Sequence, residues 1–484
     1  MPTTSRRRFL KSGASAAMVS MMPSAAQAQD RPRKNVLFIG VDDLNTSLKC
    51  YGHKTVESPN LDKLAGRGVR FNAAYCQYPL CNPSRSSLMT GMAPDRTRVY
   101  GNQRHFRESL PDAVSLGQLF RKNGYYSARV GKIYHYNNPE QIGTDGLDDP
   151  ITWDWTFDPC GVDHLKEESL VTNFTPHRPT LGSTITFYPS PAKEEEITDA
   201  IGAKAVIQLL EQHRKDPFFI AYGLYRPHVP WIVPSQYFDR YSVDQIQALP
   251  FDPEELHIAP PPAYWTQPPN FGMNDSQQRQ AIRAYYAATT FMDAQVGKVL
   301  NALESLGLAE NTIVVFWADH GWALGRHGQW MKQTLFEDAT RVPVMLAGPG
   351  ISHGQVCPRT IEHLDIYPTL VELCGLQGAP RALHGESLGS LLRDPMAAWS
   401  KPAVTQVTRG TDEHPSLFGY SVRTERYRYT SWQDGYAGEE LYDYQSDPDE
   451  SKNLAADPAM REVKLVLQTQ LHAITAARGK PSLS

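Results

Sequence analysis

Short runs of apolar residues alternate along the chain with longer amphipathic stretches. Asn35–Val41 (NVLFIGV) and Thr312–Trp317 are almost continuously hydrophobic, which is typical of strands buried on both faces of a parallel sheet. Tyr125–Val130 and Phe218–Gly223 are apolar runs of similar length. The pattern therefore predicts at least four buried strands spread over the first two thirds of the chain.

The stretches between these runs repeat apolar residues with the period of a helix. Ile197–His213 and Gln280–Leu306 show this periodicity most clearly. Alternation of strands and helices predicts an α/β fold with a mostly parallel sheet covered by helices. Residues 137–195 and 225–275 are rich in Pro, Asp and aromatic residues, and we interpret them as long insertions that wall a site.

The pattern changes after about residue 395. Tyr420–Trp432 alternates like antiparallel strands, and Pro458–Ala477 predicts a final helix. A chain of this length exceeds the usual limit for one hydrophobic core. We therefore expect a large α/β domain over residues 29–395 and a smaller α+β subdomain, with a small antiparallel sheet and a helix, over residues 396–484.

The first 28 residues have the pattern of an export signal. Arg6 and Arg7 stand in the basic stretch SRRRFLK, a weakly apolar stretch comes next, and Ala26-Gln27-Ala28 resembles a cleavage site. This predicts a twin-arginine signal peptide, export by the twin-arginine machinery, and a periplasmic or secreted product. No later run approaches the roughly 18–20 apolar residues that span a bilayer, so we expect no membrane span.

Composition narrows the classes of function. The chain is 41% hydrophobic and 21% charged, as in an ordinary globular protein. Its 48 Lys and Arg against 52 Asp and Glu give a net charge of −4, which indicates no nucleic-acid partner. An anionic substrate therefore needs positive charge supplied locally. The six cysteines show no disulfide framework and no zinc-site spacing.

Chemically capable side chains stand at or just beyond the ends of the four predicted strands. Ligands of open parallel sheets bind beyond the carboxyl ends of the strands, so we expect these side chains to meet at one edge. Two adjacent carboxylates with a third from another strand suit a hard divalent cation, and calcium and magnesium both fit. The residues in question are Asp42, Asp43, Lys132, His135, His228, Asp319 and His320.

The segment Cys81–Gly91 (CNPSRSSLMTG) combines a nucleophile with helix-boundary residues. Pro83 suits the first turn of a helix, and Gly91 suits its end. Cys81 would then lie at a helix N-terminus, where backbone N–H groups and the helix dipole favour an anion. Arg85 adds a positive charge one turn further on. A nucleophile in this setting indicates sulfate or phosphate chemistry.

Cys81–Gly91 resembles the sulfatase signature C-x-P-S-R-x4-T-G at all six defined positions. Gly124–His135 is similar to a second signature of that family, and the resemblance continues through Asp319–Trp322 and Gly419–Thr430. Within the family these stretches are most similar to bacterial iduronate-2-sulfatase-like enzymes. The resemblance implies an alkaline-phosphatase-like sheet flanked by helices and a formylglycine-dependent sulfatase activity.

In that family a formylglycine-generating or sulfatase-maturing enzyme converts the signature cysteine to formylglycine, whose hydrate is the nucleophile. The resemblance implies that Lys132 and Lys332 bind sulfate oxygens, that His228 protonates the leaving oxygen, and that His135 accepts a proton from the nucleophile. The implied catalytic residues are Cys81, Arg85, Lys132, His135, His228 and Lys332. The implied ligands of calcium, or of magnesium, are Asp42, Asp43, Cys81, Asp319 and His320.

The resemblance also implies a sulfated saccharide as the substrate, such as a uronate 2-sulfate. We expect Trp322, beside the metal site, to stack on a sugar ring. The uronate-specific relatives carry a lysine shortly before GYS, whereas the stretch from Thr411 to Phe418 contains no Lys or Arg. Arg409 is the nearest basic residue to that position.

Three other hydrolase classes share parts of this pattern. A formylglycine-dependent phosphonate monoester or phosphodiester hydrolase would share the aldehyde, the metal and the fold, and it stays open as the alternative. A cysteine phosphatase needs C-x5-R, but position 87 is Ser87. Gly385–Gly389 fits G-x-S-x-G but lacks the apolar strand that a serine hydrolase places before this motif, so we interpret it as a loop-to-helix turn.

Overall fold

The computed structural model describes residues 33–411 and 414–481. Residues from Arg33 onward belong to one compact unit. The predicted export signal over residues 1–28 lies outside the described residues. Within the described part of the chain, no helix combines the length and the apolar character that crossing a bilayer requires.

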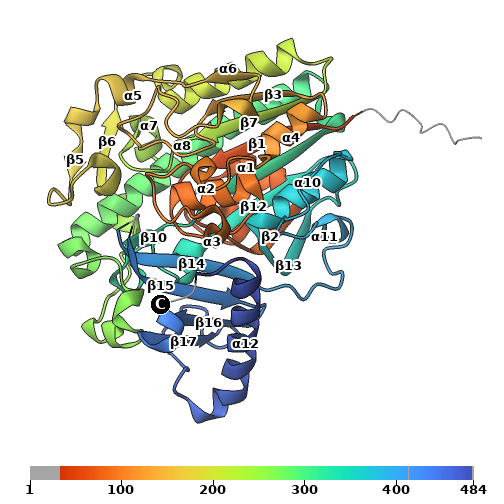
Figure 1. Ribbon diagram of the computed structural model, residues 1–484. Helices are drawn as coiled ribbons and strands as arrows, with labels where there is room; N and C mark the ends of the chain where they lie inside the picture. The colour runs from red at the N-terminus through yellow and green to blue at the C-terminus, as the bar shows by residue number, and fades with distance from the viewer. Residues whose placement is uncertain (1–32, 412–413, 482–484) are drawn as a thin grey trace, which may run out of the picture. The chain divides into compact units, whose positions relative to one another are not determined.

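An eight-stranded sheet forms the centre of the structure, in the order β13-β2-β12-β9-β1-β7-β3-β4 (Figure 1). Strand β12 runs antiparallel to both of its neighbours, and the other pairings in this sheet are parallel. The mostly parallel α/β fold is therefore confirmed. The strands are β1 (Asn35–Val41), β2 (Gly68–Tyr75), β3 (Tyr126–Gly131), β4 (Trp155–Phe157), β7 (Phe218–Leu224), β9 (Thr312–Ala318), β12 (Arg341–Ala347) and β13 (Gln355–Glu362).

The three central strands are buried along their whole length. Every residue of β1, β7 and β9 is buried, because helices cover both faces of the sheet. The register pairs Ile39 of β1 with Tyr222 of β7 and with Phe316 of β9. All four predicted strands are present within one or two residues of their predicted ends.

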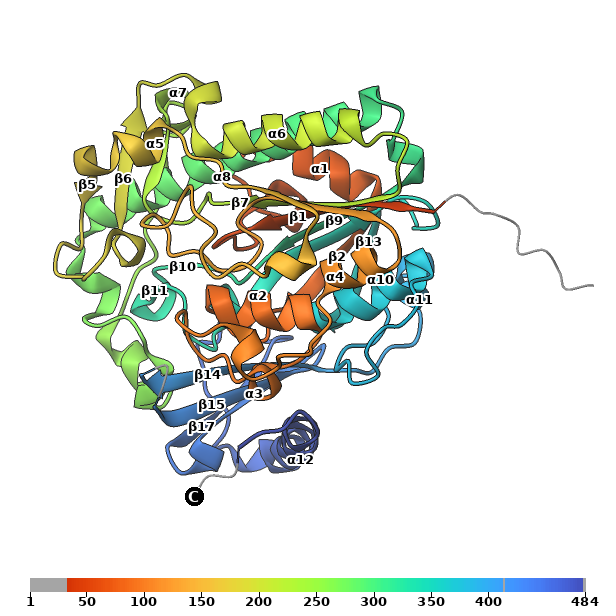
Figure 2. The same cartoon turned by 45° about the horizontal axis from the view of Figure 1, so that its top comes forward.

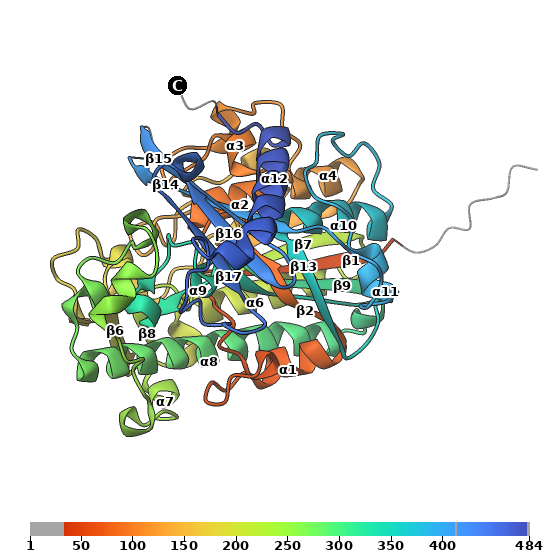
Figure 3. The ribbon, with the colours of Figure 1, turned by 90° about the horizontal axis from the view of Figure 1, so that it is seen from below.

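Helices lie on both faces of the central sheet (Figures 2 and 3). One face is covered by α1 (Pro59–Gly66), α6 (Thr198–Gln212) and α8 (Asp275–Ser305), and the other by α2 (Cys81–Thr90), α4 (Leu116–Lys122) and α10 (Ile366–Cys374). Helix α8 begins five residues before the predicted start, because the side chain of Asn274 accepts a hydrogen bond from the Gln277 N–H and caps the helix. Shorter helices are α3 (Pro94–Thr97), α9 (Glu337–Thr340) and α11 (Gly389–Arg393). Gly385 to Leu388 form a loop leading into α11, which confirms the loop-to-helix turn.

The two insertions fold into ordered layers beside α8. They contain a three-stranded sheet of β5 (Thr172–Asn173), β6 (Thr186–Ser190) and β8 (Trp231–Pro234), together with the short helices α5 (Val162–Leu165) and α7 (Ser235–Phe238). Trp231 is fully buried and packs edge-on against Tyr285 of α8. A hairpin of β10 (Ala323–Leu324) and β11 (Trp330–Met331) comes after the end of β9.

The C-terminal part of the chain forms an antiparallel sheet in the order β14-β15-β16-β17, with α12 (Arg461–Ala477) packed across it (Figure 1). Its strands are β14 (Ala403–Gly410), β15 (Pro415–Arg423), β16 (Tyr427–Trp432) and β17 (Gly438–Asp443). Leu467 and Leu471 of α12 pack with Tyr429 and Val422 in a separate apolar core. The predicted domain boundary at residue 395 stays a prediction, because the residues on both sides of it belong to the same compact unit.

One ion pair joins the end of the chain to the central sheet. Arg478 comes directly after α12 and donates two hydrogen bonds, of 2.8 and 2.6 Å, to the carboxylate of Glu362 at the end of β13. Glu362 has no exposed surface and also accepts the N–H of Val404. A doubly hydrogen-bonded arginine–carboxylate pair of this kind fixes geometry as well as charge.

Candidate active site

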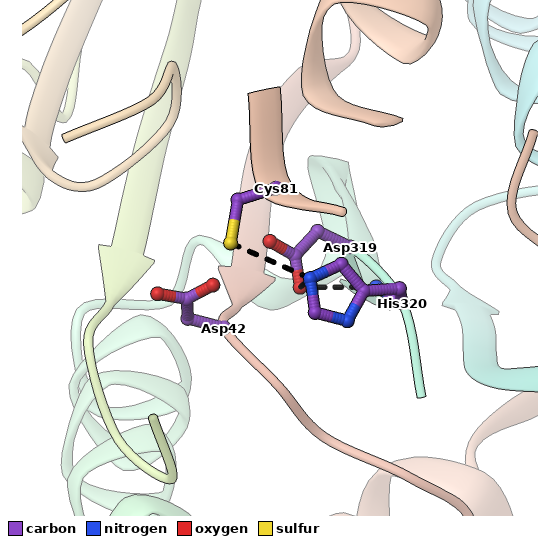
Figure 4. Close-up of side chains that lie close together, drawn as sticks. All are labelled: Asp42, Cys81, Asp319 and His320. Carbon is purple, nitrogen blue, oxygen red and sulfur yellow. Dashed lines mark hydrogen bonds and ion pairs between the residues drawn. The ribbon is translucent and has the colours of Figure 1, made fainter. Parts of the chain in front are cut away.

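The residues predicted at the strand ends meet at one edge of the central sheet. Asp42 stands directly after β1, Lys132 after β3 and Asp319 after β9, and all three side chains are fully buried. In Figure 4, Asp42, Cys81, Asp319 and His320 lie close together with their polar atoms around one point. Parallel strands produce this convergence, because their carboxyl ends lie at the same edge.

Cys81 is the first residue of α2. Leu80 before it is extended, and Gly91 ends the helix in the left-handed conformation with φ of 68°, as predicted. Cys81 is 1% exposed, and its Sγ lies 3.4 Å from Nε2 of His320 and 3.2 Å from Nζ of Lys332. Burial raises the pKa of this thiol, but the charges of Lys332, Lys132 and His320 outweigh it and hold the pKa well below its usual value. The site therefore stabilises negative charge at position 81.

Two adjacent carboxylates face Cys81. Oδ2 of Asp42 accepts a hydrogen bond of 2.6 Å from Lys132, and Oδ1 of Asp43 accepts one of 2.6 Å from Lys332. The other oxygen of each, Oδ1 of Asp42 and Oδ2 of Asp43, is buried without a hydrogen-bond partner. Burial and the nearby thiol raise the pKa of Asp42, but Lys132, His228 and Arg85 bring it below its usual range. Two negatively charged oxygens with unused lone pairs indicate that a cation belongs here.

Asp319 is held in place by hydrogen bonds to both of its oxygens. Oδ1 accepts the backbone N–H groups of Asp43 and His320, at 3.1 and 3.0 Å, and Oδ2 accepts Nε of Arg85 at 2.8 Å. Burial raises the pKa of Asp319 to about 7 despite the adjacent Arg85. A bound cation would favour the ionised form of this carboxyl group.

Arg85 joins α2 to the ends of two strands. Besides Asp319, its guanidinium donates to the carbonyl oxygens of Lys132 and Ile133, at 2.5 and 3.1 Å, and lies over the ring of Trp317. Arg85 has no exposed surface. It therefore orients the helix that carries Cys81 relative to the carboxylates.

Three histidines surround the nucleophile position, and their ring contacts suggest which nitrogen faces the site. His320 places Nδ1 2.9 Å from the Gly321 carbonyl, so Nδ1 donates there and Nε2 faces Cys81. His228 places Nδ1 2.6 Å from the carbonyl of Val229, and its Nε2 lies 3.6 Å from Oδ2 of Asp43. His135 contacts Asn137 through Nε2, and its Nδ1 is buried without a partner. Burial lowers the pKa of His135, which favours a neutral ring able to accept a proton.

The donor set fits a divalent cation. Asp42, Cys81, Asp319 and His320 each offer one ligand atom, and these atoms lie within 4.8 Å of one another. Asp43 and His228 form a second such group with Cys81. The two carboxylate oxygens without hydrogen-bond partners supply hard oxygen ligands of the kind that calcium and magnesium prefer.

A cavity of about 350 Å³ leads away from this group. Much of its lining comes from residues 137–195 and 225–275, which confirms that the insertions wall a pocket. His135, His228 and Lys332 line it on the side of Cys81, so the chemical groups open into the cavity. Its volume lies within the usual range for small-ligand sites.

The expected sugar contact of Trp322 is corrected, and Arg409 has a structural role. The Trp322 side chain has no exposed surface and packs between Tyr285 and Trp231, so it offers no free face to a sugar ring. Arg409 lies between the rings of Trp265 and Trp432, and its Nε and one terminal nitrogen donate to the carbonyl of Pro262. This arginine therefore positions Trp265, which lines the cavity.

The structure also brings in residues that the sequence did not suggest. Tyr285 of α8 donates from its hydroxyl group to the carbonyl of Asp43 and accepts the N–H of Asn45, which fixes the loop after β1. Asn138 and Arg178 line the cavity. Asn138 stands three residues after His135, so its place near the site could have been predicted from the sequence. No sequence pattern around Arg178 indicates that it lines the cavity.

Comparison with known proteins agrees with the geometry. The sulfatase family model matches residues 34–376, and the model of the C-terminal region of N-sulphoglucosamine sulphohydrolase matches residues 325–477. A sulfatase of Formosa agariphila is 34% identical over 440 residues, covering 88% of this chain and 83% of the relative. Iduronate 2-sulfatase of Homo sapiens is 32% identical over 510 residues, covering 87% and 91%.

Among solved structures, the phosphonate monoester hydrolase of Silicibacter pomeroyi superposes with a TM-score of 0.76 at 23% identity, covering 93% of this chain and 97% of the other. At this identity the likeness shows a common fold alone. The family match spans most of the chain and includes the Cys81 segment and the strand-end residues. The chain belongs to the sulfatase family and is a sulfuric ester hydrolase.

Proposed function

We propose that this sulfatase hydrolyses the sulfate ester of a sulfated saccharide, of the uronate 2-sulfate class, with a formylglycine made from Cys81 and a calcium ion. One observation carries the proposal. The Cys81 side chain lies at a helix N-terminus within 3.4 Å of both Lys332 and His320, facing carboxylates that each have one oxygen without a hydrogen-bond partner. Sulfatases generally use a formylglycine made from cysteine and a divalent metal ion, and the residues around position 81 fit both groups.

The calcium ion would be held by Asp42, Asp43, Asp319, His320 and position 81. When bound, it would supply Lewis-acid stabilisation of negative charge on the nucleophile and on the sulfate group. The chain's contribution is to hold the ligands in place. Asp319 is fixed by two backbone N–H groups and Arg85, and Nε2 of His320 is directed inward by its contact with Gly321.

As formylglycine hydrate, position 81 would supply a hydroxyl nucleophile and a second hydroxyl through which sulfate can be released. A thiolate offers no such release route, which explains why the chain would need the modified residue. The N-terminus of α2 and the charge of Lys332 favour negative charge at this position.

The remaining polar side chains have complementary tasks. Lys132 and Lys332 would bind sulfate oxygens. Their ammonium groups already lie in the site, where they donate to Asp42 and Asp43. His228 would donate a proton to the leaving oxygen from Nε2, because its Nδ1 is engaged with a backbone carbonyl and Asp43 stands nearby. His135 would accept a proton at Nδ1, which is buried without a partner. The two histidines thus divide acid and base roles.

The saccharide assignment is supported by similarity and by the walls of the cavity. Human iduronate 2-sulfatase is 32% identical over most of its length. The cavity is lined by amides and hydroxyl-bearing residues, with one half-buried indole from Trp265. Such a lining suits a hydroxylated ring.

Peptide mass spectrometry of active protein tests the nucleophile. Formylglycine is expected at position 81, and Cys81→Ala is expected to fold and to be inactive. Cys374→Ala provides the matched control, because this cysteine lies in α10 outside the site. Full activity with an unmodified thiol would contradict the mechanism.

A substrate panel tests the class of ester. Sulfated uronates should be hydrolysed faster than 4-nitrophenyl sulfate and choline sulfate. Faster turnover of a phosphonate monoester than of every sulfate ester would favour the phosphonate or phosphodiester hydrolase instead. Turnover of small non-sugar sulfates alone would overturn the saccharide assignment.

We also propose that residues 1–28 direct twin-arginine export to the periplasm or the medium. That route carries folded proteins, so the maturing enzyme would have to act on Cys81 in the cytoplasm. Support comes from the sequence pattern around Arg6 and Arg7.

A further inference from the structure

One cation in the cavity has no part in the chemistry described above. Arg178 lines the same cavity as His135, His228 and Lys332. Its Nε donates to the carbonyl of Ser183, and its guanidinium lies over the ring of Phe271, 4.6 Å from the centroid. These contacts fix the side chain and leave its two terminal nitrogens without a protein partner among the described residues.

Arg178 is half-buried, and it differs from the buried Lys132 and Lys332 in its lack of a counter-charge. Lys132 and Lys332 are each paired with a carboxylate, whereas no acidic side chain in residues 33–411 or 414–481 forms an ion pair with Arg178. Glu140 also lines the cavity, yet it forms no ion pair with Arg178. Partial burial without a counter-charge lowers the pKa of Arg178, which indicates a cation that has lost part of its hydration. An anion entering the cavity would relieve that cost.

A second unpartnered polar group lies on the same wall. Asn138 is 3% exposed and lines the cavity, and neither its side-chain oxygen nor its nitrogen has a hydrogen-bond partner. The loop that carries Arg178 packs against it, since a Cβ added at Gly182 would lie 2.0 Å from the carbonyl oxygen of Asn138. A buried amide without partners indicates a ligand that supplies them.

We propose that Arg178 and Asn138 form a subsite that binds the carboxylate of the uronate ring whose sulfate ester is cleaved. The proposal rests on the proposed function and adds the residues that recognise the substrate. With Nε of Arg178 occupied by Ser183, the terminal nitrogens offer parallel N–H groups that match the two oxygens of a carboxylate. The Asn138 amide would donate to the same carboxylate or to the adjacent ring oxygen.

The test compares variants on a charged and an uncharged substrate. Arg178→Gln should lower kcat/KM for a 2-sulfated uronate by about 10- to 100-fold, the usual effect of losing a hydrogen bond to a charged group. Most of the loss should appear in KM. Arg178→Lys should recover part of the activity, and Asn138→Asp should be worse than Asn138→Ala, because it places a second negative charge beside the carboxylate.

Three substrates identify the group that is recognised. Neither Arg178→Gln nor Asn138→Asp should change kcat/KM by more than about threefold for 4-nitrophenyl sulfate or for the carboxyl-reduced 2-sulfated sugar. A disulfated hexose that has no carboxylate tests whether the subsite binds a second sulfate group instead. Arg381→Gln, at an exposed position outside the cavity, is the matched arginine control.

The outcomes separate this proposal from the proposed function. If the wild type cleaves the 2-sulfated uronate and Arg178→Gln lowers kcat/KM equally for all substrates, Arg178 has a structural role. In that case only the subsite proposal is overturned. If Arg178→Gln lowers kcat/KM selectively for the hexose disulfate, the carboxylate assignment is likewise overturned. If wild type cleaves aryl sulfates but no sulfated uronate, the saccharide assignment fails and the subsite fails with it.

Discussion

The ammonium group of Lys332 lies 2.6 Å from Oδ1 of Asp43, and the same Nζ lies 3.2 Å from Sγ of Cys81. Both neighbours of Lys332 hold it there through their backbone. Met331 and Gln333 each have a φ of 70°, and the Gln333 N–H donates to the carbonyl of Pro79 at 3.0 Å. Left-handed backbone costs non-glycine residues on the order of 1 kcal/mol each. The rest of the fold must offset this cost, and the result is that the Lys332 ammonium group is held in the site.

Removal of this charge is expected to impair catalysis more than stability. Lys332→Met should lower kcat for 4-nitrophenyl sulfate by roughly 10²- to 10³-fold, as for the loss of one stabilising donor at a reaction centre. Lys298→Met, which removes a half-exposed lysine paired with Glu194, should keep wild-type kcat. Steady-state kinetics with a thermal melt of each variant checks this. A fall of less than about threefold would remove Lys332 from the chemistry.

Calcium should stabilise the folded protein through the carboxylate pair. At a calcium concentration 100 times Kd, the expected gain in unfolding free energy is about 2.7 kcal/mol. Treatment with a chelator should lower Tm, and added calcium should restore it, because the oxygens of Asp42 and Asp43 without hydrogen-bond partners then coordinate the ion. Differential scanning calorimetry measures the shift, and magnesium serves as the comparison ion.

Asp42→Asn should abolish most of the calcium-induced rise in Tm. An exposed acidic residue, as in Asp275→Asn at the start of α8, is the matched control and should leave the rise intact. An unchanged calcium response in Asp42→Asn would place the ion elsewhere.

Trp322 should prove to be a core residue rather than a sugar platform. Trp322→Ala should lower the free energy of unfolding by about 3–5 kcal/mol, because it leaves a cavity between Tyr285 and Trp231. Urea titration measures this loss. Any residual activity should fall by the same factor on aryl and saccharide sulfates, whereas Trp265→Ala, in the cavity wall, should affect the saccharide more. A stable Trp322→Ala protein with a selective rise in saccharide KM would restore the stacking role.

The Glu362–Arg478 pair should make stability depend on pH. Burial raises the pKa of Glu362, but Arg478 and Lys401 outweigh it and lower the pKa from 4.5 to about 2. A carboxyl group with a lowered folded-state pKa stabilises the protein above its unfolded pKa. This contribution, about 3 kcal/mol, is lost as pH falls from about 4.5 toward 2.

Arg478→Met should lower the free energy of unfolding at pH 7 by up to about 3–5 kcal/mol, because buried Glu362 then loses two hydrogen bonds and keeps only Lys401 as a counter-charge. The difference from wild type should narrow below pH 4.5, where Glu362 of the variant is protonated. Urea unfolding at pH 7 and pH 4 measures both values, with Arg461→Met, at the exposed start of α12, as control. An equal cost at the two pH values would show that the loss is one of packing.

Export should depend on the paired arginines. Replacement of both Arg6 and Arg7 by lysine should leave the protein in the cytoplasm, because that route recognises the arginine pair. Cell fractionation with an activity assay of each fraction gives the result. Normal secretion of the double variant would rule out the proposed route.

The centre of the fold and the chemical residues could be predicted from the sequence for one physical reason. Strands such as β1 and β9 are apolar on both faces, and the residues at their carboxyl ends must lie at the same edge of a parallel sheet. Asp42 and Asp319 could therefore be brought together from the sequence alone. Strands β2, β4, β12 and β13 were not predicted; β2 and β13 carry exposed polar residues and lack a continuous apolar run, and β4 has only three residues.

Other features depend on packing between distant segments. Trp322 stands two residues after His320, yet only the positions of Tyr285 and Trp231 determine that its ring is enclosed. Arg178 is a candidate binding residue because no acidic side chain among the described residues pairs with it in the cavity. The sequence around Arg178 does not reveal this.

The almost complete burial of Cys81 sets a time limit on any enzyme that must reach its thiol. Lys332, which helps to close the site, is encoded 251 residues later in the chain. At synthesis rates of about 5–20 residues per second, the thiol emerges from the ribosome roughly 13–50 s before Lys332 does. Within that interval the nascent chain cannot yet form the finished pocket. Slower translation of the segment between them would lengthen the period of access, and faster translation would shorten it.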